Sequence, residues 1–236
     1  SILHRYLQGS HPPLPELFVL SFSQSIHSHS PRLRHFLGIF EFLLPDNTKA
    51  IVDKAAEIGV SVLAVTDHND VSSVPAFRNA AEGRGIHIFP GFELSSSEGV
   101  HVLCVYPPNT PQEELERYLG QFGITKPGPS SYLSNLNFIE TLRLVRERGG
   151  VTIAAHVAND KGLFQVLSGQ ARIRVWQAED LLAIQIPGPV EDLPQDVRQI
   201  VENKNPDYRR LHAADDRLAV AVVNARDIVK AEDLDD

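Results

Sequence analysis

Val62-Leu63-Ala64-Val65-Thr66-Asp67-His68 is the stretch that decides the fold of this chain. Its first half is a short apolar run, which predicts a strand buried on both faces. Asp67 and His68 follow where that strand would end. A buried strand that ends in polar, reactive side chains is typical of α/β proteins, whose sites form beyond the carboxyl ends of parallel strands.

The same pattern, a short apolar run followed by a helix-period segment, recurs along the chain. The predicted strands cover 17–22, 62–66, 86–89, 101–106, 151–155, 182–186 and 218–223, and the predicted helices cover 46–58, 74–84, 111–122, 137–148 and 195–202. Pro90-Gly91 should end the third strand. Alternation of strands and helices implies parallel pairing and an α/β fold, and seven strands suit a barrel. We expect an N-terminal arm over residues 1–16 and a single barrel domain over residues 17–236.

Composition excludes several classes of protein. The 236 residues carry 22 Lys and Arg against 30 Asp and Glu, and this net charge of −8 argues against a protein that coats DNA or RNA. A nucleotide substrate in a local positive pocket remains compatible with it. The single cysteine, Cys104, excludes a disulfide framework and indicates a reducing compartment. No apolar run approaches the roughly 20 residues of a membrane span and no secretory leader is visible, so we expect a cytoplasmic protein.

Two common catalytic motifs are missing from the sequence. It contains neither a Gly-rich loop ending in Lys-Ser/Thr, which P-loop nucleotide hydrolysis requires, nor a Gly-x-Ser-x-Gly elbow. Cys104 lies within the apolar run Val102-Leu103-Cys104-Val105, where a cysteine is usually inert packing.

Histidines and one carboxylate accompany several predicted strands. His27 and His29 follow the first strand, His68 the second and Glu93 the third, His101 begins the fourth, and His156 follows the fifth. Residues beyond the strand ends of a barrel converge on one mouth, as the ligands of a metal ion must. His27 and His29 would point to the same face of an extended chain and grip one ion. Each motif alone is weak, and only the combination favours a metal site.

Five short motifs occur in an order that resembles the PHP family, named after bacterial DNA polymerases and histidinol phosphatases. They are Ile26-His27-Ser28-His29-Ser30, Val65-Thr66-Asp67-His68-Asn69, Pro90-Gly91-Phe92-Glu93, Val100-His101-Val102-Leu103 and Ala155-His156. The resemblance covers residues 17–223. Later stretches, including Gly162-Leu163 and Leu167-Ser168-Gly169-Gln170-Ala171-Arg172, further resemble the N-terminal PHP domain of TrlF-like proteins. In those proteins an AAA-like ATPase region follows, so the resemblance implies an ATPase region or subunit as partner.

The resemblance implies a distorted (β/α)7 TIM-like barrel that hydrolyses phosphate esters with a water activated by divalent ions. The implied ligands are His27 and His29 on one ion, Glu93 as a bridge, His101 and His156 on a second ion, and His35 with His68 on a third. The ions would be Zn²⁺, Mn²⁺ or Fe²⁺, two or three in number. Asp67 would orient a ligand histidine, or else serve as an ordinary turn or cap residue. The substrate would be a phosphorylated small molecule or a nucleic acid end, cleaved as a phosphomonoester or a phosphodiester.

The last motif departs from the family pattern, which is Asp-x-His with both side chains on metal. Asn224 stands where the Asp is expected and Arg226 where the His is expected. Asparagine is a weaker, neutral ligand, and arginine cannot bind a metal. Arg226 would instead bind the substrate phosphate together with Arg209 and Arg210 and assist catalysis, or pair with Asp227 at the surface. Further candidates for phosphate contact are Arg32, Arg34, Lys161 and Arg172.

Two other functions stay open on the sequence alone. Amidohydrolases also carry a His-x-His motif on a barrel, but Glu93 and His101 on the middle strands favour the phosphoesterase. The second is a degenerate PHP module that binds nucleotide or metal for a partner ATPase, a hypothesis that rests on Asn224 and Arg226. The oligomeric state does not follow from the sequence.

Overall fold

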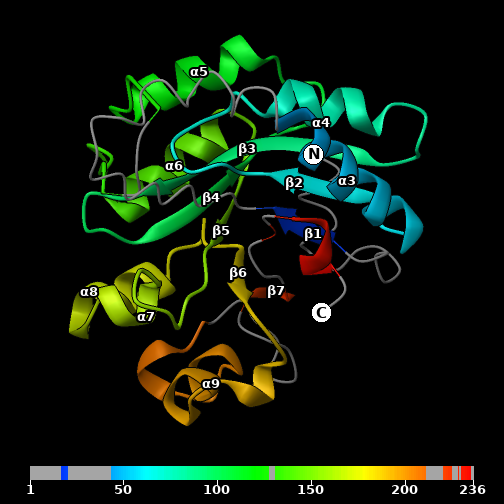
Figure 1. The fold of residues 1–236 in the computed structure, drawn as a ribbon. Helices are drawn as coiled ribbons and strands as arrows, with labels where there is room; N and C mark the ends of the chain where they lie inside the picture. Colours follow the sequence, from blue (N-terminus) through cyan, green and yellow to red (C-terminus); the bar gives the residue numbers. More distant parts are fainter. Residues whose placement is uncertain are drawn as a thin grey trace, which may run out of the picture.

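The computed structural model describes residues 17–20, 44–127, 131–210, 220–224, 228 and 230–234. Seven strands form one curled sheet in the order β1-β2-β3-β4-β5-β6-β7 (Figure 1). The strands are β1 (Leu17–Leu20), β2 (Val62–Val65), β3 (His87–Ser95), β4 (His101–Val105), β5 (Val151–Ala154), β6 (Ala183–Ile186) and β7 (Ala221–Asn224). Neighbours in sequence are therefore neighbours in the sheet. The expected arm over residues 1–16 lies outside the described residues.

Helices cover the outer face of the sheet. They are α3 (Leu44–Glu57), α4 (Val74–Ala81), α5 (Gln112–Gln121), α6 (Phe138–Glu147), α7 (Leu163–Val166), α8 (Gly169–Trp176) and α9 (Gln195–Val201), with the short 3-10 turns η2 (Val190–Asp192), η3 (Pro206–Tyr208) and η4 (Ala231–Leu234). Helix α4 packs on β3, α6 packs on β5, and η4 contacts α3. Periodicity did not predict α7 and α8, which are only one to two turns long. No helix in the described part of the chain is long and apolar enough to cross a membrane.

The direction of β4 corrects the expectation of an all-parallel sheet. Strands β1 to β3 are parallel to one another, as are β5 to β7, but β4 is antiparallel to both β3 and β5. Only residues 96–100 separate β3 from β4, and this connection is too short for a crossover helix, so a hairpin is the only pairing available. The fold is α/β with a mixed sheet, and it departs from regular β/α alternation at this hairpin.

The predicted end of the third strand at Pro90-Gly91 is wrong, because β3 continues to Ser95. Pro90 lacks an N–H group, but its carbonyl accepts a hydrogen bond from the Tyr106 N–H at 2.8 Å, and pairing with β4 begins at the next residue, Gly91. Gly91 permits the close approach of β4, since a Cβ there would overlap the carbonyl oxygen of Cys104.

Both faces of the sheet are buried. The larger core fills the space between the outer face and the helices, and a smaller cluster lies on the inner face. The inner cluster consists of Ala64, Phe89, Leu103, Val105, Val151, Ile153, Ala155, Ala183 and Val223. Side chains alternate along a strand, and His68, Glu93 and His101 each lie an even number of residues from a member of this cluster. These three side chains therefore continue the inner face at one end of the sheet.

The hairpin and the start of α6 are tied together by polar groups. Asn137 and Glu140 form a capping box, in which the Glu140 N–H donates to Asn137 at 3.0 Å and the Asn137 N–H donates to Glu140 at 2.9 Å. Glu98, in the hairpin loop, accepts a further bond from the Phe138 N–H at 3.0 Å. The helix start thus helps to hold the loop between β3 and β4.

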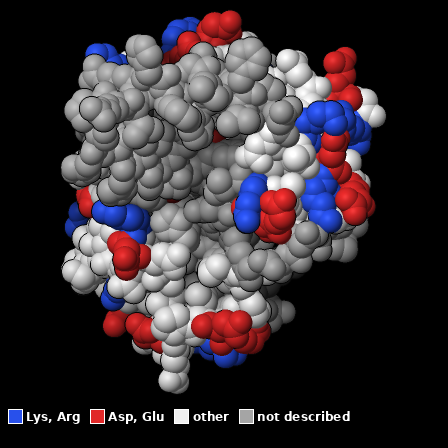
Figure 2. Space-filling view, viewed as in Figure 1, with Lys and Arg blue, Asp and Glu red and all other residues white. Residues whose placement is uncertain are grey.

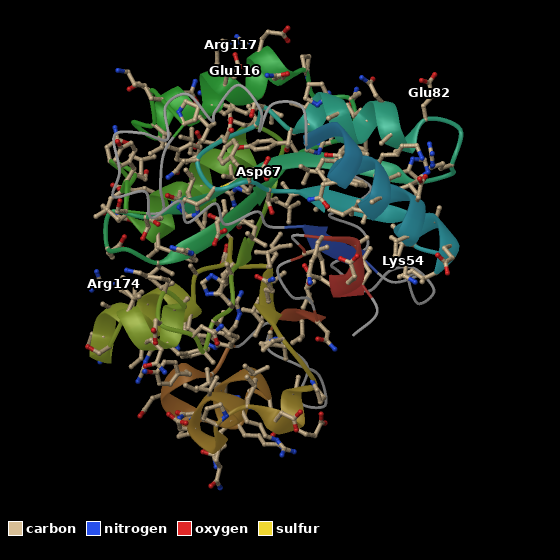
Figure 3. The ribbon with its side chains drawn as sticks, in the orientation of Figure 1. Lys54, Asp67, Glu82, Glu116, Arg117 and Arg174 are labelled. Carbon is tan, nitrogen blue, oxygen red and sulfur yellow. The ribbon has the colours of Figure 1, made fainter. Side chains whose placement is uncertain are left out.

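Charged side chains are mixed over the visible surface. In Figure 2 the described Lys and Arg side chains lie beside Asp and Glu side chains and form no separate basic surface on that face. Figure 3 shows Lys54, Glu82, Glu116, Arg117 and Arg174 at the periphery, whereas Asp67 lies near the centre of the molecule. The mixed surface agrees with the low basic content of the sequence.

Replacement of Gly91 by alanine tests the close approach of β3 and β4. The added methyl group would overlap the Cys104 carbonyl, and overpacking of this kind costs about 1–3 kcal/mol. Urea unfolding should therefore show a lower free energy of unfolding for Gly91→Ala. Gly120→Ala is the control, since a Cβ at this helical position meets no atom within 4 Å and should be neutral or slightly stabilising. Equal stabilities of the two variants would contradict the assignment.

Candidate metal centre

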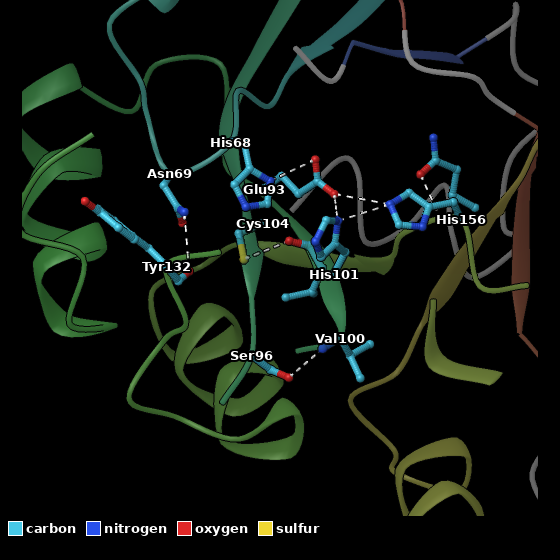
Figure 4. A network of polar contacts seen from close by, with 11 residues as sticks. His68, Asn69, Glu93, Ser96, Val100, His101, Cys104, Tyr132 and His156 are labelled. Atoms are coloured by element: carbon cyan, nitrogen blue, oxygen red, sulfur yellow. Dashed lines mark hydrogen bonds and ion pairs between the residues drawn. The ribbon is translucent and has the colours of Figure 1, made fainter. Parts of the chain in front are cut away.

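Three histidines surround the buried carboxylate of Glu93 (Figure 4). His101 Nδ1 lies 2.7 Å and His156 Nε2 lies 3.4 Å from Glu93 Oε1. His68 Nδ1 lies 3.4 Å from the other oxygen, Oε2. We call these four residues the Glu93 cluster. The two oxygens of the carboxylate therefore face different histidines.

His68 reaches the cluster because strand pairing continues beyond the end of β2. The Glu93 N–H donates to the Asp67 carbonyl at 3.0 Å, and the Asn69 N–H donates to the Glu93 carbonyl at 2.9 Å. His68 and Glu93 consequently form an isolated parallel bridge. Asn69 then takes a left-handed backbone conformation with φ of 55°, which turns the chain away from the sheet. The local sequence His68-Asn69 suits this end, since asparagine tolerates positive φ better than most residues.

His101 joins the cluster because β4 is antiparallel. Because β4 runs in the opposite direction, its first residue lies at the end of the sheet where the parallel strands finish. His101, at the start of β4, therefore lies near residues that follow the ends of the parallel strands, such as His68. His101 pairs with Ser95, which places its side chain diagonally across from Glu93 on the same face. The sequence predicted the residue but not the strand direction that explains its position.

His156 occupies a strained position just after β5. Ala155 belongs to the inner cluster, so simple alternation would send the next side chain to the opposite face. His156 instead has a φ of 29°, and this left-handed conformation returns its ring to the inner side. The side chain of Gln185 on β6 accepts a hydrogen bond from the His156 N–H at 3.2 Å, and the Gln185 carbonyl accepts one from Val157 at 3.2 Å. Sequence reasoning missed Gln185, although a buried amide in the apolar strand Ala-Ile-Gln-Ile was a visible signal.

A cavity of about 510 Å³ opens beside the cluster. It is lined by His68, Glu93, His101, His156, Ala158, Asn159, Asp160 and Lys161. The loop that closes it is held by its own turns and by β4, because the His101 N–H donates to the Lys161 carbonyl at 3.0 Å. Gly162 is required at the end of this loop, since a Cβ there would overlap the His156 carbonyl. The backbone of Lys161 is thus anchored to a strand that carries a cluster histidine.

The electrostatics of the cluster favour an ionised carboxylate. Burial by itself raises the pKa of Glu93, but the hydrogen bonds from His101, His156 and His68 outweigh it and hold that pKa well below the ordinary range. A buried carboxylate of this kind requires positive charge or hydrogen-bond donors around it. The cluster supplies donors from three separate elements of the fold.

The donor atoms suit a divalent metal ion. Ligand atoms about 2.1 Å from a tetrahedral ion lie roughly 3.4 Å apart. His101 Nδ1 and His156 Nε2 are 3.2 Å apart, and both approach the same oxygen of Glu93. His68, Glu93 and His101 form a group whose ligand atoms all lie within 4.8 Å of one another. Neutral imidazoles and a carboxylate are typical ligands of Zn²⁺, Mn²⁺ and Fe²⁺.

Two buried ring nitrogens support the same conclusion. Within the described residues, Nε2 of His68 and Nε2 of His101 have no hydrogen-bond partner. Buried polar atoms are rarely left in this state unless an ion or ordered water completes them. We therefore regard the Glu93 cluster as a candidate metal centre.

Asp67 has a local structural contact. Its carboxylate accepts a hydrogen bond from the hydroxyl of Ser73, the residue that precedes α4. Burial raises its pKa to about 7, although the bond from Ser73 opposes that shift. This contact ties Asp67 to the turn before α4, and its role in orienting a ligand histidine stays a prediction.

The arginines expected to bind phosphate lie elsewhere. The guanidinium of Arg210 is buried and donates to the carbonyls of Trp176 and Leu181, and burial lowers its pKa to about 10. These are structural contacts, and a contact between Arg210 and a phosphate stays a prediction. Arg209 and Asn224 are exposed, and neither belongs to the described residues that line the cavity. His27, His29, His35 and Arg226 lie outside the described residues.

Comparison with known proteins finds one family model that matches part of the chain. Residues 45–160 match the family model of the PHP domain. No curated protein matches the sequence significantly. The lesion-specific endonuclease EndoQ from Pyrococcus furiosus has a similar structure, with a TM-score of 0.50 and 13% identity over 79% of this chain but only 44% of the endonuclease. At this identity the likeness shows a shared fold.

Two further solved structures are more distant. A protein from Bifidobacterium adolescentis assigned as a metal-dependent phosphoesterase matches with a TM-score of 0.48 and 14% identity, over 80% of this chain and 82% of the other. An amidohydrolase from Chromobacterium violaceum matches with a TM-score of 0.41 and 16% identity, over 72% of this chain and 76% of the other.

Removal of the Glu93 charge should weaken metal binding. Glutamine keeps the shape of the side chain but offers only a neutral oxygen, so we expect Glu93→Gln to lower the affinity for Zn²⁺ or Mn²⁺ about 10-fold or more. Isothermal titration of chelator-treated protein, with elemental analysis after dialysis, measures this. Glu82→Gln makes the same change at an exposed peripheral site and serves as the control. Unchanged affinity in Glu93→Gln would exclude the cluster as a metal site.

Proposed function

Since residues 45–160 of this chain match the family model of the PHP domain, we propose that the protein is a metal-dependent phosphoesterase whose site is the Glu93 cluster. The observation that carries the proposal is the convergence of three imidazoles on one buried carboxylate beside an open cavity. A hydrolase of phosphate esters needs such a cavity next to its metal ligands, because the phosphoryl group must reach them from solvent.

The cluster residues would divide between two ions. Glu93 Oε1 with His101 and His156 would hold one, and Glu93 Oε2 with His68 would contribute to the other. His27, His29 and His35 remain proposed ligands, with Asn224 as a weaker one. When bound, divalent ions lower the pKa of a coordinated water and withdraw charge from phosphoryl oxygens. The hydrogen bonds of Gln185 and the Lys161 carbonyl would keep His156 and His101 in place during turnover.

Lys161 would bind the substrate phosphate in the place expected for the arginines. It is the cation among the described residues that line the cavity, and its backbone is held by the His101 N–H. An ammonium group is a strong donor to phosphate oxygens. Asp160 on the same loop carries a negative charge and would repel misplaced anions, which favours a single orientation of the phosphoryl group.

For the substrate we propose a nucleic-acid phosphodiester in preference to a small phosphomonoester. The lesion-specific endonuclease shares the fold over most of this chain, although the chain covers less than half of that enzyme. The degenerate module that serves an ATPase is the second candidate, because Asn224 stands where the family pattern has an aspartate. An ATPase partner and the identity of the ions remain predictions.

Removal and return of metal tests the activity. Chelator-treated protein should lose hydrolysis of bis-p-nitrophenyl phosphate and of single-stranded DNA, and added Zn²⁺, Mn²⁺ or Fe²⁺ should restore it. His68→Ala should remain inactive with the same ions, because one side of the carboxylate loses its partner. Metal-loaded protein that binds nucleotide but hydrolyses neither substrate would favour the degenerate module.

Truncation of Lys161 should slow the reaction, because the substrate phosphate loses a hydrogen bond to a cation. Loss of one charge-assisted hydrogen bond lowers kcat/KM by about 10- to 150-fold. We expect Lys161→Ala to show this loss, and to weaken inhibition by inorganic phosphate, at unchanged metal content. Lys204→Ala is the control, since Lys204 is exposed and pairs with Glu202 at 2.8 Å. Equal kinetics in the two variants would remove Lys161 from the site.

A further inference from the structure

Two large apolar side chains are exposed beside the Glu93 cluster. Tyr132 and Leu133 are 52% and 50% exposed, and Ile58, at 39%, is the other large hydrophobic residue exposed in the described part of the chain. Two of these three side chains are therefore neighbours in sequence. Contiguous exposed apolar surface marks contact sites more often than scattered single residues do.

The backbone of this pair is attached to the strands that carry the cluster. Asn69, which follows His68, donates from its side chain to the Tyr132 carbonyl at 3.5 Å. Leu133 forms a parallel bridge with Ser95, two residues after Glu93, and the Ser134 N–H donates to the Ser95 carbonyl at 2.7 Å. Figure 4 shows Tyr132 next to Asn69, with its ring directed away from Glu93. The pair thus has a fixed place adjacent to the cluster and does not cover it.

A second cavity lies under this pair. Its volume is about 400 Å³, and it is lined by Gly123, Ile124, Thr125, Lys126, Ser131, Tyr132 and Leu133. These lining residues include one cation and no acid, although the whole chain has a net charge of −8. Gly123 follows α5 with a φ of +84°, and a Cβ there would crowd Asn135 at 3.1 Å, so the floor of the cavity is closely packed. The site combines an aromatic face, an aliphatic face and a positive charge.

We propose that Tyr132, Leu133 and Lys126 bind a nucleoside of the substrate next to the phosphate that is cleaved. The base would stack on the ring of Tyr132 and contact the side chain of Leu133. Lys126 would contact a flanking phosphate. A base can lie on a tyrosine only when it is unstacked, so the substrate class is single-stranded nucleic acid or an unpaired end. This inference rests on the proposed phosphoesterase function and names its substrate class.

Binding of base-bearing and abasic probes tests the proposal without turnover. Fluorescence anisotropy of chelator-treated protein would compare a labelled oligothymidylate with an abasic strand of the same length. Stacking on one aromatic side chain strengthens binding about 5- to 150-fold, so the wild type should prefer the base-bearing strand by such a factor. Tyr132→Ala should abolish the preference, whereas Tyr132→Phe should keep it. Since Tyr132 is 52% exposed, its truncation leaves the core intact.

The matched controls separate stacking from general effects. Ile58→Ala removes the other exposed hydrophobic side chain and should keep the preference. Lys126→Ala should weaken both strands equally and reduce the salt dependence of binding. Equal affinity of the wild type for the two strands, or an unchanged preference in Tyr132→Ala, would overturn the proposal.

Two other results have distinct meanings. A change in sedimentation in Tyr132→Ala, with no effect on strand binding, would assign the pair to a protein contact and overturn the proposal. A clear preference for bases in a protein that hydrolyses no phosphoester under any metal would support the nucleoside site and refute the proposed catalytic function.

Discussion

Burial of one negative charge is the constraint on which the site depends. Glu93 lies on the inner face of the sheet, where its carboxylate is almost fully removed from solvent, and three imidazoles from other elements compensate for the lost solvation. The surrounding structure is arranged to bring them there. A strand extension delivers His68, a reversed strand delivers His101, and a strained residue after β5 delivers His156. If the carboxylate faced solvent, water would stabilise its charge, and these three features of the backbone would not be needed to stabilise it.

Most strands could be predicted from local sequence, because buried apolar runs with turn residues at their ends report directly on burial. The exception is β3, where Pro90-Gly91 resembles a strand end but is the point at which pairing with β4 begins. Strand direction was not predictable from the runs themselves. The short loop between Ser95 and His101 indicates that β4 is antiparallel to β3, since so few residues cannot form the crossover that parallel strands need.

The candidate ligands could be named from type and order, but their supports could not. The Gln185 side chain accepts a hydrogen bond from the His156 N–H, and the Lys161 carbonyl accepts one from the His101 N–H. These contacts exist only in the folded chain. Arg210 illustrates the opposite case, because a guanidinium suited to phosphate is also suited to satisfy carbonyls such as those of Trp176 and Leu181. Residue type therefore limits the contacts that a side chain can make, and its burial in the fold decides which of those contacts form.

Net charge and substrate charge need not agree at such a site. At physiological salt a surface charge is screened over about 8 Å, so an overall charge of −8 exerts little force on a phosphate already inside a cavity. What acts there is the local set of groups: three imidazoles, the Glu93 carboxylate that they compensate, and Asp160 and Lys161 on the anchored loop. The second cavity differs in its charges, since its lining includes Lys126 and no acid. A site in which one lysine stands beside fixed acids would favour substrates with a few well-placed phosphates over long polyanions held by charge alone.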